Sequence, residues 1–592
     1  MPTADGAIRV ANCSGFYGDR VAAAREQVEG GPIDYLTGDW LAELTMLILS
    51  RNRAKAPATG FAKTFLTQME QVMGTCLDRG IKVVSNAGGL NPAGCADAVA
   101  DVAGRLGLSP TIAYVEGDDL MDRLDELAAA GIDLTNMDTG ERLADRGVDV
   151  LTANAYLGVW GIVEALGRGA DIVITGRTTD AAVAAAPAAH HFGWKRDDWD
   201  RLAGAIVAGH VIECGAQATG GNYSFFGEVP GIEYVGFPIA ELFDDGSCVI
   251  TKHEGTGGQV SLGTVTSQLL YEVGPPAYAN PDVVARFDTI RLEQVGPDRV
   301  RISETRGEPA PPTLKVCINY QAGYRNGYTF ALTGLDVPEK AALVERQLFA
   351  PFPGGRDHFE ETEVQLLRTD KDDPATNEEA VALLKITVKD RDPEKIGRRF
   401  ANAAVEIGLA SIPGFFGVSG APGPAQPFGA YWPALVPAEL VPQHVVVRDG
   451  ERTVVDNTSG DLPGAAIDPL EIPLPAPPTG ETRRAPLGLV VGARSGDKGG
   501  NANVGLFCRS AEAFAWLDSY LTVERFRELF GDLAHLDVDR YRLANIWSLN
   551  FVVHGILDEG VAASNRQDAQ AKGLGEYLRA RHVDLPVSLL SN

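Results

Sequence analysis

The chain has 592 residues and a mass of 62.9 kDa. That is well beyond the roughly 250 to 300 residues at which a single core stops growing, so two or three domains are expected. A hydrophobic fraction of 45% with 22% charged residues is typical of a globular protein and excludes disordered and collagen-like classes. The net charge of -27 opposes a phosphate backbone, and no basic stripe overrides it, so nucleic acid is excluded as a partner.

The seven cysteines are odd in number, widely spread and contain no C-x-x-C pair. This pattern argues against a disulfide framework and a structural zinc site, and it favours a reducing, cytoplasmic location. The N-terminus lacks the basic and apolar regions of a signal peptide, and no apolar stretch reaches the 18 or so residues that span a bilayer. We therefore expect a protein that is neither exported nor embedded in a membrane.

Residues 1–235 alternate short apolar runs with helical patterns, which predicts an α/β region with a mostly parallel sheet. The runs are apolar on both sides of the pleat, as in strands covered by helices on both faces. Strands are expected at 8–11, 81–85, 111–115 and 171–175, and helices at 93–106 and 156–166.

Residues 236–465 contain longer runs rich in Thr, Val and Tyr, separated by Gly and Pro turns. This pattern predicts an α+β second part with strands at 288–303 and 313–318 and a helix at 392–409. A proline-rich linker follows at 466–486. Residues 487–592 then predict a small ferredoxin-like α+β domain. Within it, strands at 487–493 and 504–508 flank a polar loop, and two helical patterns, a strand at 550–557 and a helix from about 568 follow.

The loop after 81–85 carries candidate anion-binding groups, because ligands of open α/β sheets bind beyond the carboxyl ends of strands. Asn91 is placed to cap a helix that starts at Pro92, and Asn86 lies at the strand end. Gly88 and Gly89 allow backbone N–H groups to approach a ligand, although glycines that merely turn the chain are an equal alternative. The loop matches neither a Walker A motif nor G-x-G-x-x-G, so ATP and NAD are not expected.

The loop after 171–175 contains Arg177, Thr178 and Asp180. A guanidinium at a strand end can bind a carboxylate or phosphate with two hydrogen bonds, and a threonine can cap the next helix. Asp118 and Asp119 follow the strand at 111–115. Acidic residues are common in the first turn of a helix, so capping is favoured there over metal binding or acid/base chemistry.

His210 and Glu213 lie three residues apart, hence on one face of a helix, and form a candidate acid/base pair. Asp180 is a third candidate catalytic residue. The alternative is a buried core histidine. Cys214 is either a nucleophile or a small buried residue. The glycine-rich segments nearby add two candidate substrate-binding residues, Asn222 and Glu254.

The polar segment 494–503 is too long for a tight hairpin, which predicts a binding or docking loop. Its candidate substrate-binding residues are Asp497, Lys498, Asn501 and Asn503. We expect this loop to join the strand-end loops in one composite site. The alternative is that it caps its own domain or contacts another subunit.

The motifs NAGGLNP, TGRTTDAA, GHVIECGAQATGGN, HEGTGG and ARSGDKGGNANVG together resemble the acyclic terpene utilization (AtuA) family. The resemblance covers residues 6–465 as its main domain and 487–589 as its appended ferredoxin-fold domain. It implies a role in catabolism of branched acyclic terpenoids such as citronellol and geraniol as CoA thioesters. It carries no catalytic residue assignment.

The sequence is compatible with two functions. The first is a hydratase or lyase that acts on an acyl-CoA thioester or related carboxylate, since polar, glycine-rich loops gather at strand ends. The second is a non-catalytic scaffold or accessory subunit for an acyl-CoA carboxylase or another pathway enzyme. No cofactor or metal ligand is predicted beyond the CoA thioester substrate, the need for a divalent metal is open, and a homo-oligomer is expected.

Overall fold

The computed structural model describes residues 6–448, 450–458 and 467–590. The chain forms two compact units, each described by itself below. The first is drawn from Met1–Asn319, Tyr431–Val561 and Gln570–Asn592, and the second from Tyr320–Ala430 and Ala562–Ala569. Residues 236–465, expected as one α+β region, are therefore divided between the units.

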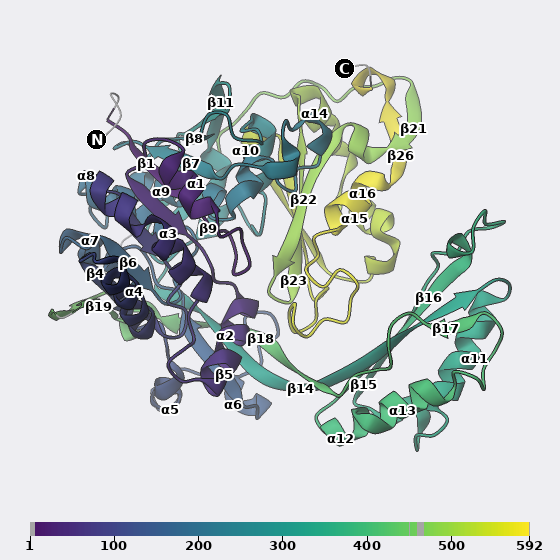
Figure 1. Cartoon of the computed structure of the whole chain (residues 1–592). Coiled ribbons are helices and arrows are strands. Elements are labelled where there is room, and N and C mark those ends of the chain that lie inside the picture. The colour runs from purple at the N-terminus through teal and green to yellow at the C-terminus, as the bar shows by residue number, and fades with distance from the viewer. Residues whose placement is uncertain (1–5, 449, 459–466, 591–592) are drawn as a thin grey trace. The chain divides into compact units, whose positions relative to one another are not determined.

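The first unit is built on an 11-stranded sheet with the order β11-β12-β8-β7-β1-β2-β3-β6-β4-β19-β20 (Figure 1). Its five central strands are parallel to one another. They are β1 (Ile8–Asn12), β2 (Tyr35–Gly38), β3 (Lys82–Ser85), β6 (Ile172–Thr175) and β4 (Ile112–Glu116). All four strands expected in this region are confirmed, whereas β2 had no sequence prediction.

Antiparallel strands extend this sheet on both sides. Next to β1 lie β7 (Pro238–Leu242), β8 (Cys248–Lys252), β12 (Arg299–Ser303) and β11 (Arg291–Gly296). Next to β4 lie β19 (Gln443–Val447) and β20 (Arg452–Val455). The single strand expected at 288–303 is thus wrong, because a turn with Asp298 at φ 51° folds it into the β11–β12 hairpin.

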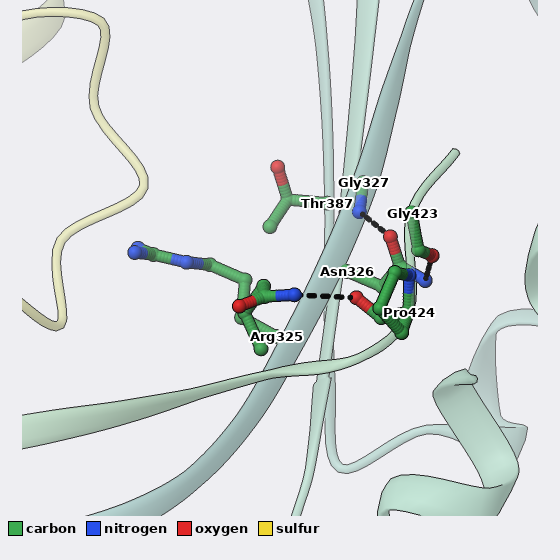
Figure 2. A pocket seen from close by; sticks show the side chains of 7 residues that line it. Arg325, Asn326, Gly327, Thr387, Gly423 and Pro424 are labelled. Carbon is green, nitrogen blue, oxygen red and sulfur yellow. Dashed lines mark hydrogen bonds between the residues drawn. The ribbon is translucent and has the colours of Figure 1, made fainter. Parts of the chain in front are cut away.

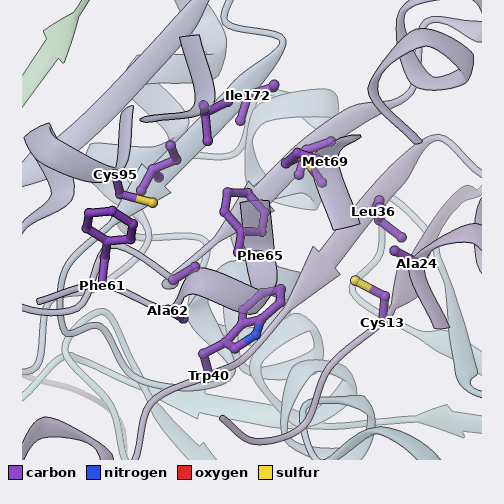
Figure 3. Close-up of a cluster of buried hydrophobic side chains, with 14 of the residues drawn as sticks. Cys13, Ala24, Leu36, Trp40, Phe61, Ala62, Phe65, Met69, Cys95 and Ile172 are labelled. Carbon is purple, nitrogen blue, oxygen red and sulfur yellow. The ribbon is translucent and has the colours of Figure 1, made fainter. Parts of the chain in front are cut away.

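Helices cover the parallel strands. α1 (Ala23–Glu29), α3 (Lys63–Arg79) and α4 (Pro92–Leu106) pack with the strands around a core that includes Phe65, Met69 and Ile172 (Figure 3). α8 (Ala182–Phe192) packs against both α7 (Trp160–Gly167) and α9 (Trp199–Ile212), and it also contacts β1 and β2. The remaining longer helices of this body are α2 (Glu43–Lys55) and α10 (Leu262–Leu269).

The expected helix at 156–166 begins later, at Trp160, because residues 150–155 form β5 (Val150–Ala155) and the chain must turn after it. β5 pairs with β14 (Thr313–Thr333), whose first residues are the strand expected at 313–318. No helix among the described residues is long and apolar enough to cross a bilayer.

The ferredoxin-like C-terminal domain belongs to the first unit, except for Ala562–Ala569, which are grouped with the second. Its antiparallel sheet has the order β22-β23-β25-β24, formed by β22 (Val491–Lys498), β23 (Asn501–Cys508), β25 (Ser548–Val553) and β24 (Val538–Leu543). The helices are α14 (Ala511–Tyr520), α15 (Val523–Phe530) and α16 (Leu574–Ala580). Outside this sheet, β21 (Thr482–Pro486) pairs with β26 (His582–Pro586) in an antiparallel two-stranded sheet.

The prediction of a long polar loop at 494–503 is wrong. β22 and β23 continue to a two-residue turn at Gly499 and Gly500, with Lys498 opposite Asn501. These strands are polar because their side chains hydrogen-bond to the α/β part of the first unit. Asn503, for example, donates to the Leu270 carbonyl at 2.6 Å.

The proline-rich segment has no regular structure from residue 467 to 480, and residue 466 of the expected linker lies outside the described residues. It is anchored at its start, where the Leu470 N–H donates to the Asp288 carbonyl at 2.9 Å. Its expected last residues instead belong to β21, since Arg484 pairs with Asp584.

The second unit is a sheet of order β15-β16-β14-β17 covered by helices. Its strands besides β14 are β15 (Glu361–Leu367), β16 (Val381–Asp390) and β17 (Phe415–Gly417), and β18 (Gln426–Pro437) pairs with β14. Its helices are α11 (Val337–Phe349), α12 (Pro393–Ile396) and α13 (Arg398–Glu406). The helix expected at 392–409 is therefore present but broken at Gly397.

Candidate functional site

Polar side chains follow the carboxyl ends of all five parallel strands of the first unit. Asn12 ends β1, Asp39 follows β2, Asn86 follows β3, Asp118 follows β4 and Arg177 follows β6. All five residues are buried. Because parallel strands end at the same edge of a sheet, these groups converge where α/β proteins bind ligands.

Three carboxylates meet at this edge. Asp39, Asp180 and Glu213 each offer one oxygen, and these oxygens lie within 4.8 Å of one another. Asp39 and Glu213 are each 5% exposed, whereas the Asp180 side chain is 29% exposed. The structure thus brings together two residues predicted from the sequence and adds Asp39, which was missed because β2 was not recognised as a strand.

Neighbouring groups fix the orientation of these carboxylates. The Asn86 amide donates to Asp39 Oδ1, as does the Leu41 N–H at 3.0 Å. Arg177 Nη1 donates to Asp180 Oδ1 at 2.7 Å and to the Leu41 carbonyl at 3.0 Å. The guanidinium carbon also lies 4.2 Å from the centre of the Tyr156 ring, so the fully buried cation is held on three sides.

The electrostatics of the three carboxyls is unusual. Burial raises the pKa of Asp39 well above its ordinary value, and the charge of Asp180 adds to this. Burial and the charge of Asp180 likewise raise the pKa of Glu213. Burial also raises the pKa of Asp180, although Arg177 works in the opposite direction. The three acids therefore keep their protons to higher pH than free carboxyl groups do.

Asp118 and Asp119 have separate roles. Asp118 accepts hydrogen bonds from the Arg177 N–H at 2.8 Å and from Asn154 Nδ2 at 2.9 Å, so it positions the Arg177 loop. Burial raises the pKa of Asp118 to about 7. Asp119 accepts from the Met121 N–H at 3.0 Å, which is a local turn contact, because the N-cap residue of the following 3₁₀ helix is Leu120 and has no side-chain cap.

His210 lies in the last turn of α9 and is 1% exposed. Its Nδ1 is 3.5 Å from Glu213 Oε1, so the predicted pairing along one helix face is present. The ring packs against Tyr278 and Phe287 with ring centres 5.4 and 5.5 Å away. Burial lowers the pKa of His210 to about 4, which leaves the imidazole neutral near pH 7.

A second titratable pair comes from the junction with the ferredoxin-like domain. Lys498, at the end of β22, donates to the main-chain carbonyl of Glu272 at 3.3 Å. Burial and the charge of Asp497 raise the pKa of Glu272 to about 7. Burial and the charge of Lys315 lower the pKa of Lys498 to about 8. Both groups therefore titrate near neutrality.

Glu43, Tyr156 and Lys315 form the third part of the site. The Tyr156 hydroxyl donates to Glu43 Oε1 at 2.7 Å, and Lys315 Nζ lies 3.9 Å from the same oxygen. Burial alone would raise the pKa of Glu43, but Lys315 and Arg177 outweigh it and hold the pKa at about 2. Glu43 is thus a permanent anion between two cations.

Electrostatic interactions join these parts into one network. The charges of Glu272, Asp180 and Lys498 all act on the pKa of His210. Glu43 and Asp180 in turn raise the pKa of Glu272. The groups at the strand ends and the end of β22 therefore lie within electrostatic reach of one another, as a composite site requires.

Several predicted site residues have structural partners instead. Asn91 caps α4 by accepting from the Gly94 N–H at 2.9 Å, which confirms the expected cap. A Cβ on Gly88 would lie 2.5 Å from the Thr175 carbonyl oxygen, so this glycine permits close packing on β6. Gly89 has φ +53°, and a Cβ there would lie 2.4 Å from Leu49 Cδ1. Gly88 is thus needed for close packing and Gly89 for a turn, and binding of an anion by this loop stays a prediction.

The remaining predicted residues lie in different surroundings. Thr178 is fully buried next to Arg177, and its main chain forms a β-bridge with Leu157. Asn222 and Glu254 are exposed in turns. Asn501 donates to Asp138 Oδ1 at 2.8 Å, and Asn503 is fully buried in the junction. Their assignment to substrate binding stays a prediction.

All seven cysteines are free thiols. Burial raises the pKa of Cys214 well above its ordinary value, with the charge of Glu213 adding to the shift. A thiol of raised pKa is a poor nucleophile at neutral pH. The interpretation of Cys214 as a small buried residue is therefore favoured.

Comparison with known families agrees with this architecture. Residues 8–447 match the model described as "Acyclic terpene utilisation family protein AtuA", and residues 485–584 match "AtuA ferredoxin-like domain". The first match spans well over half of the chain. The chain belongs to the AtuA family. Membership connects the chain to acyclic terpene utilisation, and no curated protein or solved structure matches the chain in the same comparisons.

Proposed function

We propose that this AtuA-family chain is a hydratase or lyase that acts on an acyl-CoA thioester or a related carboxylate of acyclic terpenoid catabolism. The observation that carries the proposal is the contact of Lys498 Nζ with the main-chain carbonyl of Glu272 at 3.3 Å, which brings two titratable residues close together. Burial and neighbouring charges shift the pKa of Glu272 to about 7 and that of Lys498 to about 8. Efficient general acids and bases have pKa values close to the operating pH.

In the dehydration direction, the Glu272 carboxylate takes the proton from the carbon next to the thioester carbonyl. Lys498 gives a proton to the departing β-hydroxyl group, so that the C–H and C–O bonds break and water leaves. Glu272 is then protonated and Lys498 neutral, and exchange with solvent restores both. We assign these roles to this pair rather than to His210 and Glu213, because His210 is only 1% exposed.

The substrate class follows from the surrounding charges. Lys315 and Lys498 repel each other strongly enough for Lys315 to lower the pKa of Lys498. Glu43 and Glu272 offset part of that repulsion, and an anionic substrate group beside the two ammonium groups would offset more of it. A carboxylate or a CoA phosphate supplies such a group, whereas a neutral terpenoid alcohol does not.

The test is turnover of a panel of branched enoyl- and 3-hydroxyacyl-CoA thioesters by the purified chain. Glu272→Gln and Lys498→Met are each expected to lower kcat/KM by about a hundredfold or more. Glu70→Gln, at an exposed position of α3, is the matched control and should keep full activity. A folded wild-type protein that turns over none of the panel contradicts the proposal, and a carboxylase that co-purifies in fixed ratio would then indicate the accessory role.

We also propose a cytoplasmic homo-oligomer that binds a small-molecule substrate. The seven free thiols support a reducing compartment. Oligomerisation is the usual state of enzymes of this size. Light scattering on the purified chain measures it directly.

A further inference from the structure

The oxygens of the three clustered carboxylates lack hydrogen-bond donors on the side where they meet. Asp39 Oδ1 accepts from Asn86 and from the Leu41 N–H, and Asp180 Oδ1 accepts from Arg177. Within the part of the chain that the structure describes, no donor reaches Asp39 Oδ2, Asp180 Oδ2 or either oxygen of Glu213. Carboxylate oxygens without a protein donor are available to another binding partner.

The charge balance points to the sign of that partner. Asp39, Asp180 and Glu213 supply three negative charges when ionised, and Arg177 is the contacting cation among the described residues. Three negative charges and one positive charge leave two negative charges in a largely buried space. Uncompensated buried charge is costly, and one divalent cation would neutralise it.

His210 provides a second, independent observation. Its Nδ1 faces Glu213 Oε1 at 3.5 Å, and the ring is buried. Gln268 lies close by, yet neither ring nitrogen has a partner at hydrogen-bonding geometry among the described residues. An unpartnered buried imidazole beside one carboxylate of a cluster of three is typical of the surroundings of a metal ion.

We propose that Asp39, Asp180 and Glu213 bind one divalent metal ion of the Mg²⁺ or Mn²⁺ class. These ions prefer oxygen ligands at roughly 2.0 to 2.1 Å, which puts ligand oxygens about 3 to 4.2 Å apart in an octahedron. The observed spacing, within 4.8 Å, needs only a small contraction to reach this geometry.

The groups around the three carboxylates are also those expected around metal ligands. Asn86 and Arg177 each donate to one oxygen of a ligand, and the other oxygen has no protein donor among the described residues. Such outer contacts orient metal ligands in proteins. Asp180 is the most exposed of the three, so water or substrate would complete the coordination from its side. This inference goes beyond the proposed reaction and does not depend on it.

The test uses the full chain, stripped with EDTA and titrated with Mn²⁺ in the absence of any thioester. Electron paramagnetic resonance of free Mn²⁺ should give one saturable site per chain. Asp39→Asn and Glu213→Gln should each weaken its affinity by at least about tenfold. Asp122→Asn and Glu70→Gln, at exposed positions, are the matched controls and should bind as the wild type does.

Circular dichroism of each variant establishes that it is folded, and Asp180→Asn replaces any variant that is not. Absence of saturable Mn²⁺ binding by the wild type overturns the proposal, as does unchanged affinity in folded ligand variants. A protein that binds Mn²⁺ at this site but turns over no thioester leaves the metal site standing and removes only the proposed reaction.

Discussion

At the scale of single residues, Glu272 shows how burial couples a site to stability. Its pKa rises from 4.5 to about 7. The folded chain therefore keeps this proton to higher pH than the unfolded chain does. The associated stability is fully present below pH 4.5 and is lost as pH rises through 7.

Between pH 6.5 and 8, titration of Glu272 should lower the free energy of unfolding of the EDTA-treated protein by about 1 kcal/mol. The Glu272→Gln variant has no proton to lose at this position. Its free energy of unfolding should therefore fall by about 1 kcal/mol less than that of the wild type between the two pH values. Urea unfolding at both pH values measures the difference. Glu70→Gln should show the wild-type pH dependence, and the same dependence in Glu272→Gln would refute the assignment.

At the scale of elements, the β22–β23 hairpin sets the position of Lys498. A Cβ on Gly500 would lie 2.4 Å from the Asp558 carbonyl oxygen, so Gly500→Ala must displace the turn. We expect a loss of about 1 to 3 kcal/mol in stability, together with reduced thioester turnover because Lys498 moves.

A helical glycine supplies the contrast for this hairpin variant. Gly104 is exposed in α4, and nothing lies within 4 Å of an added Cβ. Gly104→Ala should therefore raise stability by up to about 1 kcal/mol, through helix propensity alone. Thermal unfolding of both variants is the measurement, and melting temperatures that shift in the same direction would contradict the account of the turn.

At the scale of the first unit, buried amides fasten the ferredoxin-like domain to the α/β body. Asn550 donates to the Val273 carbonyl at 2.7 Å and to the Gly274 carbonyl at 2.9 Å, and it accepts from Asn503. Asn550→Leu would leave these groups buried without partners, at about 1 to 3 kcal/mol each. We expect a loss of about 3 kcal/mol in urea unfolding, whereas Asn402→Leu on the exposed side of α13 should change stability little.

The segment before this domain should behave differently. Residues 467–480 have no regular structure, and many of them are exposed. We expect limited proteolysis to cut between 468 and 480 and to spare Arg484, which is paired in β21. First cuts inside β21 or β22, mapped by mass spectrometry, would refute this boundary.

The sequence by itself determined the family, the α/β and ferredoxin-like classes, and the positions where strands end. These are local properties: apolar runs, the Asn91 cap and the motif at Arg177 can each be recognised within a few residues. The sequence also predicted that Asp180, Glu213 and His210 lie in a site, because their residue types and spacing carry that signal.

Only the tertiary structure decided which other groups join them. Asp39 follows a four-residue strand with little pattern of its own, and Glu272 and Lys315 stand in segments without a recognisable motif. The polar strands around Gly499 resembled a loop because their hydrogen-bond partners lie more than 200 residues away, as with Asn503 and Leu270. Burial and neighbouring charge, which shift these pKa values, arise only when distant segments meet, so no local pattern could have predicted them.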